Sequence, residues 1–338
     1  MVSFGSGQPD LPPPREVTEG LTIRSDLRYG LIQGELGLRE ELARGCPGST
    51  PSSFVITNGA SEALDIALRV IGASGGRIIL PRPFYYSYLP LIRYAGLEPV
   101  YTELIEGRID IEDVRRKSGS CAAILINSPS NPTGRVERTD TLREIERISE
   151  RSGMYVVSDE VYRDLIYEGE PYRLEGERVV TINSFSKTYA MCGVRVGYLW
   201  SRDQALVDRC IEMKTHTTMN TSLVSQDMAL RALRSPRDYV ARQLEVWRER
   251  RNLIYAGLCR LGLDLWRPEG AFYVLPRVPH PRLVVEKLFL DYQVITYLGE
   301  WFGAPDRIRL SYALSADLIG EGLERLRRCL EEVAELEA

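Results

Sequence analysis

The sequence predicts an α/β protein with a mostly parallel central sheet, because short β-branched runs alternate with amphipathic segments. Apolar residues recur at helical spacing between these runs, as at Leu64, Ala67 and Ile71. Strands that alternate with helices are typical of a parallel sheet flanked by helices. The expected buried strands are Phe54–Thr57, Arg77–Leu80, Cys121–Asn127, Met154–Ser158, Val179–Asn183 and Val194–Trp200.

The predicted secondary structure changes from about residue 202, where helical patterns dominate. Ser235-Pro236-Arg237-Asp238 has the order of an N-cap, a first-turn proline and an acidic residue, which predicts the start of a long helix. Three short strands and a last helix from Ala316 are expected after it. We therefore predict a large domain of residues 21–225 and a smaller α+β domain made of residues 1–20 and 226–338. The three strands are Ala271–Leu275, Val294–Tyr297 and Arg307–Ser311.

Composition narrows the class of protein. A chain of 338 residues that is 44% hydrophobic can bury a large core. A net charge of −4 gives no bulk attraction to nucleic acid or to anionic lipid, and no apolar run approaches the ~20 residues of a membrane helix. The six cysteines include no C-x-x-C pair, so we expect a reduced, cytoplasmic protein without a zinc site.

Polar residues follow several of the expected strands. Asn58-Gly59-Ala60-Ser61 leads from a strand into a helix, and the free N–H groups of such a turn bind phosphate, although this arrangement alone is common. Lys187 and Asp159 stand at the carboxyl ends of two other strands, where open α/β sheets bind ligands. A solvated loop lysine and a helix N-cap are the plain alternatives. A solvated loop position for Lys187 does not explain the hydroxyl residues around it or Arg195 further along the chain.

Four motifs occur together in a fixed order. They are Ser-Pro-Ser-Asn-Pro-Thr-Gly, Ser-Asp-Glu-Val-Tyr, Ser-Phe-Ser-Lys and Arg-Ile-Arg-Leu-Ser-Tyr. With them the chain, from about residue 5 to residue 315, resembles the class I and II aminotransferases of fold type I, the aspartate aminotransferase-like pyridoxal-phosphate enzymes. The resemblance implies that fold, pyridoxal 5′-phosphate as cofactor, and transfer of an amino group from an amino acid to a 2-oxo acid by a ping-pong mechanism.

The resemblance assigns the reacting groups. Lys187 forms a Schiff base with the cofactor and then moves the proton between the substrate Cα and the cofactor's C4′. Asp159 keeps the pyridine nitrogen protonated, so that the ring accepts electrons from Cα. Tyr162 and Asn131 hydrogen-bond the 3′ oxygen, although Tyr162 could instead be a core aromatic. Asn131-Pro132 is expected to be a cis bond.

The resemblance also assigns the cofactor's phosphate and ring contacts. The phosphate is held by the N–H groups of Gly59, Ala60 and Ser61, by the Ser184 hydroxyl and by the Arg195 guanidinium. Ser186 either assists or only packs. Tyr85 stacks on the pyridine ring, while its neighbours Phe84 and Tyr86 could be core residues.

Substrate and partner contacts follow from the same resemblance. Arg309 clamps the substrate α-carboxylate, and the backbone at Gly7 touches the same group. Asn131 contributes to this substrate site. Tyr29 matches a tyrosine that reaches the phosphate of a neighbouring subunit, which implies a homodimer with shared active sites.

The side-chain specificity is less defined. Some aspartate-specific relatives carry a lysine where this chain has Ser61, so we expect a neutral or aromatic amino donor, with 2-oxoglutarate as acceptor. An apolar pocket could be built from Phe4, Tyr85, Tyr86, Phe185 and Phe272, although core packing explains each of them. A decarboxylase or β-eliminating lyase of the same fold is the alternative chemistry, and a non-catalytic ligand-binding module is the alternative class.

Overall fold

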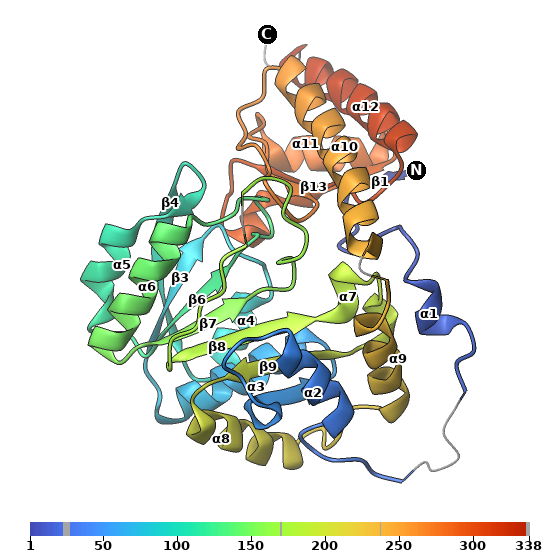
Figure 1. The fold of residues 1–338 in the computed structure, drawn as a ribbon. Coiled ribbons are helices and arrows are strands. Elements are labelled where there is room, and N and C mark those ends of the chain that lie inside the picture. Colours follow the sequence, from blue (N-terminus) through green and yellow to red (C-terminus); the bar gives the residue numbers. More distant parts are fainter. Residues whose placement is uncertain (23–27, 170, 237, 336–338) are drawn as a thin grey trace.

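The computed structural model describes residues 1–22, 28–169, 171–236 and 238–335, and its centre is an eight-stranded sheet (Figure 1). Five neighbouring strands, β8-β7-β6-β3-β4, run parallel, whereas β9 is antiparallel to both β2 and β8, and β5 is antiparallel to β4. The expected mostly parallel sheet is therefore confirmed. In the order β2-β9-β8-β7-β6-β3-β4-β5, the strands are Phe54–Thr57, Gly197–Ser201, Val179–Ser184, Tyr155–Asp159, Ala123–Asn127, Arg77–Arg82, Glu98–Ile105 and Arg108–Ile109.

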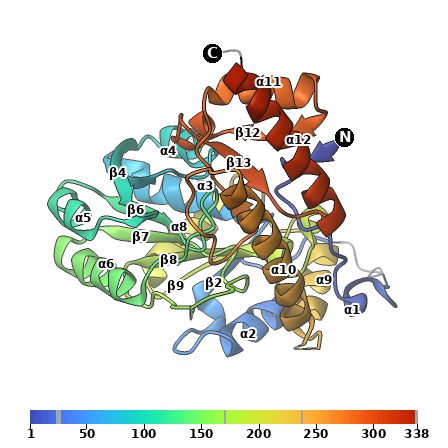
Figure 2. The ribbon, with the colours of Figure 1, turned by 90° about the horizontal axis from the view of Figure 1, so that it is seen from above.

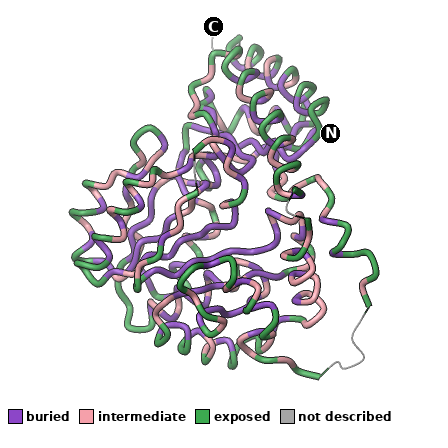
Figure 3. Tube along the Cα trace, viewed as in Figure 1, coloured by how far each residue is buried: buried purple, intermediate pink, exposed green. Residues whose placement is uncertain are grey.

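Helices cover both faces of this sheet, because alternate strand residues point to opposite sides. Ile78 and Leu80 pack in one cluster with α3 (Ala60–Ile71), α4 (Tyr88–Tyr94) and α8 (Gln204–Thr215). Ile79 lies in another cluster with α5 (Ile111–Ser118) and α6 (Thr139–Ser152). The strands are accordingly buried and the helices exposed on their outer turns (Figure 3).

Two other helices pack against the β2 end of the sheet. Phe54 and Trp200, on β2 and β9, pack with α2 (Leu36–Arg44) and α9 (Leu223–Leu233). The short α1 (Arg15–Thr18) joins this cluster through Val17.

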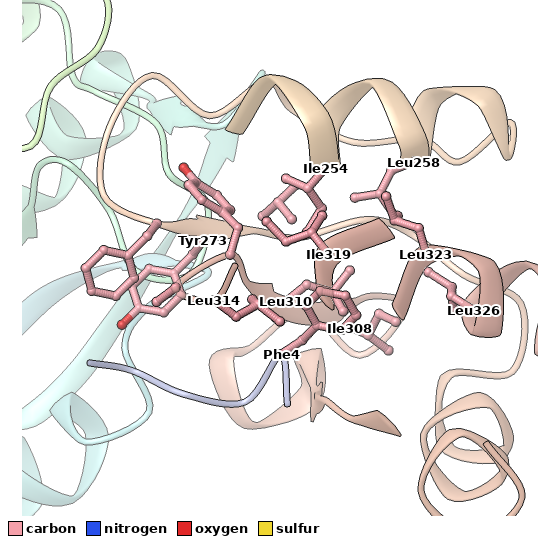
Figure 4. Packing of buried hydrophobic residues seen from close by; sticks show 14 of the residues in the cluster. Phe4, Ile254, Leu258, Tyr273, Ile308, Leu310, Leu314, Ile319, Leu323 and Leu326 are labelled. Carbon is pink, nitrogen blue, oxygen red and sulfur yellow. The ribbon is translucent and has the colours of Figure 1, made fainter. Parts of the chain in front are cut away.

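The remaining elements form a second, mixed layer (Figure 2). Here β13 (Ile308–Ser311) pairs antiparallel with β10 (Tyr273–Val274) and β12 (Tyr297–Leu298). The N-terminal β1 (Val2–Ser3) pairs parallel with β11 (Val294–Ile295), far away in the sequence. Three helices pack on these strands, and Figure 4 shows their core around Phe4, Ile254 and Leu310. They are α10 (Asp238–Arg260), α11 (Pro281–Leu290) and α12 (Ala316–Glu335).

Most predicted elements are found within a few residues, and the last helix begins at Ala316 as expected. The domain limits near residues 20 and 225 stay a prediction. β9 begins at Gly197 rather than Val194, because Cys192–Val194 forms a single 3-10 turn and Arg195 is left-handed. The hydroxyl of Ser235 donates to the Arg231 carbonyl at the end of α9. Arg237 lies outside the described residues, so the expected cap of α10 stays a prediction.

No helix in the described parts of the chain is long and apolar enough to cross a membrane.

A half-buried carboxylate joins the second layer to the central sheet. Glu269, in the loop after α10, accepts hydrogen bonds from Arg108 of β5 at 2.6 Å and from the Val136 N–H at 3.0 Å. Arg135 pairs with the same carboxylate at 3.1 Å. Removal of Glu269 would leave the largely buried guanidinium groups of Arg108 and Arg135 without this carboxylate.

We expect Glu269→Ala to lower the free energy of unfolding by roughly 3 kcal/mol. The control is Glu324→Ala on α12, which removes an exposed pair with Arg327 and should leave the free energy of unfolding nearly unchanged. Urea denaturation of both variants and of the unmodified protein measures the two changes in the free energy of unfolding. Equal, small changes in the two variants would show that the Glu269 cluster does not stabilise the junction.

Candidate active site

A cavity of about 270 Å³ lies at the carboxyl ends of β6, β7 and β8. Residues far apart in the sequence line it, and eleven of the predicted site residues are among them. The position agrees with the general rule that parallel sheets bind ligands beyond the carboxyl ends of their strands. The eleven are Gly7, Ala60, Ser61, Tyr85, Asn131, Asp159, Tyr162, Ser184, Lys187, Arg195 and Arg309.

Asp159 ends β7 and is almost completely buried. Its carboxylate accepts hydrogen bonds from the Tyr88 hydroxyl at 2.6 Å and from the Val161 N–H at 3.2 Å. Burial raises the pKa of Asp159 to about 6, while the Tyr88 and Val161 hydrogen bonds and the Lys187 ammonium act in the opposite direction. A buried carboxylate with so few donors is suited to a cationic partner in the cavity.

Lys187 lies in the single-turn helix α7 (Phe185–Thr188), directly after β8. The Ser184 hydroxyl caps this turn by accepting from the Ser186 N–H at 3.3 Å. The ammonium of Lys187 enters the cavity, where it donates to the Gly7 carbonyl at 2.5 Å and lies 3.9 Å from the Cys192 sulfur. The amine therefore lies in the same cavity as the Asp159 carboxylate.

The turn at Gly59 begins α3 beside a guanidinium. Arg195 donates to the carbonyls of Cys192 at 2.9 Å and Asn58 at 3.3 Å. Gly59 has a φ of 86°, and a Cβ there would lie 2.4 Å from the Arg195 Nη2. A Cβ at Gly197 of β9 would likewise lie 2.9 Å from the Ala60 nitrogen. These two glycines let the N–H groups of α3, the strand and the guanidinium meet at one point, which favours an anion.

Arg309 of β13 is a buried cation that also lines the cavity, and only 2% of its surface is exposed. Its guanidinium donates to the Asn131 side-chain oxygen at 3.2 Å and to the Gly5 carbonyl at 2.9 Å. Its Nε has no hydrogen-bond partner, and none of the ion pairs found among the described residues includes Arg309. A buried guanidinium that has aromatic rings around it but no ion pair with a described carboxylate is suited to a carboxylate ligand.

Asn131 and Tyr162 also line the cavity. Asn131 is held by its N–H, which donates to the Asn127 side-chain oxygen at 2.7 Å, and the Asn131-Pro132 bond is cis, as expected. The Tyr162 hydroxyl is 2.9 Å from that of Tyr273, and burial raises the pKa of Tyr162 well above its usual value.

Three of the candidate pocket aromatics are core residues instead. Phe4 and Phe272 pack in the core of the second layer, and Phe185 packs under β2 and β9. Each is at most 2% exposed, and none lines the cavity. Tyr85 and Tyr86 do line it, whereas Phe84 is buried against Tyr101.

Tyr29 lies apart from the cavity of its own chain. It is 82% exposed and lines an open surface hollow with Arg28, Asn220 and Leu223.

The sequence analysis missed several cavity residues: Tyr88, Asn127, Cys192, Tyr273 and Tyr297. Asn127 had a signal, since it is the last residue of a predicted strand and its Nδ2 donates to the Asp159 carbonyl at 2.9 Å. Tyr88 lies three residues after Tyr85, but its contact with Asp159 spans 71 residues of sequence and has no local signal.

Comparisons with known proteins agree with this geometry. Residues 1–326 match the family model for aminotransferase class I and II. The aspartate/prephenate aminotransferase of Thermus thermophilus is 33% identical over 352 residues, which cover 98% of this chain and 91% of that protein.

Solved structures give the same result. The aspartate aminotransferase of Thermotoga maritima has a TM-score of 0.93 at 31% identity, with 98% of this chain and 92% of that one covered. The aromatic aminotransferase of Pyrococcus horikoshii has a TM-score of 0.91 at 29% identity, with 98% and 96% covered. Members of this family transfer amino groups between amino acids and 2-oxo acids with pyridoxal 5′-phosphate. The chain therefore belongs to the aminotransferase class I and II family and is a pyridoxal-phosphate-dependent aminotransferase.

Proposed function

We propose that this aminotransferase takes the amino group from an amino acid with a neutral or aromatic side chain and passes it to a 2-oxo acid such as 2-oxoglutarate. The observation that carries the proposal is the number of cations in the cavity. Among the described lining residues these are Lys187, Arg195 and Arg309. The cofactor and the substrate α-carboxylate would engage all three, so an acidic donor side chain would find no further cation among the described residues that line the cavity.

The residues of the cavity fit pyridoxal 5′-phosphate. The turn from Gly59 to Ser61, the Ser184 hydroxyl and Arg195 would hold the phosphate, and Asp159 would pair with the pyridine nitrogen. Tyr85, which also lines the cavity, would cover the ring. When bound, the cofactor supplies an electron sink for the bonds at the substrate Cα.

Lys187 is the proposed base. Its ammonium shares the cavity with the Arg309 guanidinium, which we propose binds the substrate α-carboxylate. A substrate anchored there presents its Cα to the Lys187 amine, which would take the Cα proton and return it at the cofactor's C4′. The Gly7 carbonyl, which accepts from Lys187, would direct the amine and contribute to the substrate site.

Asn131 and Tyr162 would hold the 3′ oxygen of the cofactor. Asn131 already accepts from Arg309, so one side chain would touch both the cofactor and the residue that binds the substrate. The Tyr162 hydroxyl, fixed by Tyr273, would donate to the same oxygen. These contacts favour the anionic form of that oxygen.

We also propose a homodimer in which Tyr29 reaches the phosphate of the neighbouring subunit. Tyr29 is exposed in its own chain, as are Leu31 and Leu36, which are 55% and 50% exposed. Large apolar side chains gathered near one part of the surface are typical of an interface. We place the enzyme in the cytoplasm, and its six free cysteines suit a reducing compartment.

A donor panel tests the proposed specificity. Single half-reactions, followed by the cofactor's spectral change, should give kcat/KM values for phenylalanine, tyrosine or leucine at least about tenfold above that for aspartate, since the unmatched carboxylate costs more than about 1.4 kcal/mol. The matched variant Ser61→Lys adds a cation at the cavity and should raise the aspartate value relative to phenylalanine. Aspartate as the best donor of the unmodified enzyme would refute the proposal.

Tyr88→Phe tests the electrostatics of Asp159. The Tyr88 hydroxyl stabilises the carboxylate, so its loss should raise a pKa that is already about 6. The ionised form is the useful one, and activity falls as pH drops through that pKa. The acid limb of the kcat profile should therefore move to higher pH by about one unit. Tyr94→Phe, at the exposed end of the same helix, is the control, and an acid limb shared by both variants would remove Tyr88 from this role.

Arg309→Gln tests the carboxylate anchor. We expect KM for every amino donor to rise by about 100-fold or more, because a buried charged hydrogen bond is lost, while the cofactor spectrum stays unchanged. Arg309→Lys should recover only part of the affinity, since an ammonium lacks the two-pronged geometry. An unchanged KM in Arg309→Gln would mean that the carboxylate binds elsewhere. Arg282→Gln, an exposed arginine of α11, serves as the control.

A further inference from the structure

A buried ion pair lies directly behind the proposed phosphate turn. Glu62, in the first turn of α3, and Lys214, in the last turn of α8, are 11% and 0% exposed at their side chains. The Lys214 nitrogen is 3.3 Å from each carboxylate oxygen of Glu62 and donates to the Thr218 hydroxyl at 3.0 Å. The Thr218 hydroxyl also donates to Glu62. Neither charge reaches the cavity itself, since neither residue lines it.

Glu62 holds the turn in place. Its carboxylate accepts from the Asn58 main-chain N–H and, at 3.1 Å, from the Asn58 side-chain amide. The main-chain carbonyl of Asn58 accepts a hydrogen bond from Arg195. Asn58 is thus held from both sides, by an anion at its N–H and a cation at its C=O. This arrangement fixes the orientation of the N–H groups that follow at Gly59, Ala60 and Ser61.

A carboxylate in this position creates an electrostatic conflict. An acid in the first turn of a helix is favourable, but here the same N-terminus is meant to hold a phosphate with nearly two negative charges. Two anions near one helix terminus repel each other, most strongly where water is excluded. Lys214 removes the conflict, because its buried ammonium neutralises Glu62 and does not itself line the cavity.

We propose that Glu62 and Lys214 are positioning residues of the phosphate site: Glu62 orders the turn, and Lys214 cancels the charge that would otherwise repel the phosphate. The inference rests on the proposed location of the phosphate at Gly59–Ser61. It goes beyond that proposal by giving a ligand-dependent purpose to a buried pair that touches neither cofactor nor substrate.

Apoprotein binding to two ligands tests this inference. Pyridoxal 5′-phosphate and pyridoxal differ only in the phosphate, and their dissociation constants can be measured by absorbance titration. Lys214→Met leaves the Glu62 charge uncompensated and should weaken pyridoxal 5′-phosphate binding by at least about tenfold, with pyridoxal binding changed less than about twofold. Glu62→Gln/Lys214→Met removes both charges, keeps an acceptor for Asn58, and should restore most of the loss. Lys287→Met, an ion-paired lysine of α11, should affect neither ligand.

The outcomes separate the possible explanations. An unchanged affinity in Lys214→Met, an equal loss for both ligands, or a double variant no better than Lys214→Met would overturn the inference, because the pair would then be purely structural. If Lys214→Met does not fold, Glu62→Gln decides alone: it should bind pyridoxal 5′-phosphate at least as tightly as the unmodified protein, and a tenfold loss would contradict us. An unmodified apoprotein that bound both ligands equally would instead refute the phosphate location itself.

Discussion

The register of three parallel strands is the constraint on which the active site depends. Asn127 of β6 pairs with Asp159 of β7, so these two strands end at one level, and β8 runs two residues beyond Ile182, the partner of Asp159. Lys187 follows within one turn of the end of β8. A shift of one residue would turn Asp159 away from the cavity and into the helical layer. The pairing of these buried strands, which builds the core, therefore also positions the reacting groups.

Charge separation is the second organising feature. The cavity keeps a carboxylate at Asp159, an amine at Lys187 and a guanidinium at each of Arg195 and Arg309, and none of them forms a close ion pair with another described residue. Asp159 and Arg309 are buried, and buried charges without partners reduce stability. The arrangement becomes favourable when a ligand with an anion at one end, a basic ring nitrogen and a substrate carboxylate supplies the missing partners. Stability and ligand binding are in this way set by the same groups.

The sequence predicts the central sheet and most of the cavity because both leave local patterns. Strands such as Ala123–Asn127 are apolar up to their last residue, and motif residues such as Asp159 stand at the ends of strands. Strand β4 escaped prediction because it is partly exposed and carries Glu98 and Glu103, which hide its apolar character. The contact between Tyr88 and Asp159 could not be predicted, since it depends on how α4 packs against β7. The same holds for Lys214, whose partner lies 152 residues away.

The central claim, that Lys187 carries the cofactor opposite Asp159, is tested most directly by reduction of the holoenzyme with borohydride and peptide mass spectrometry. The chain has four lysines, Lys117, Lys187, Lys214 and Lys287, so the labelled position is unambiguous. We predict a phosphopyridoxyl group on Lys187 alone, and its absence in Lys187→Ala. A label on any of the other three lysines, or a protein that takes up no label, would contradict the account.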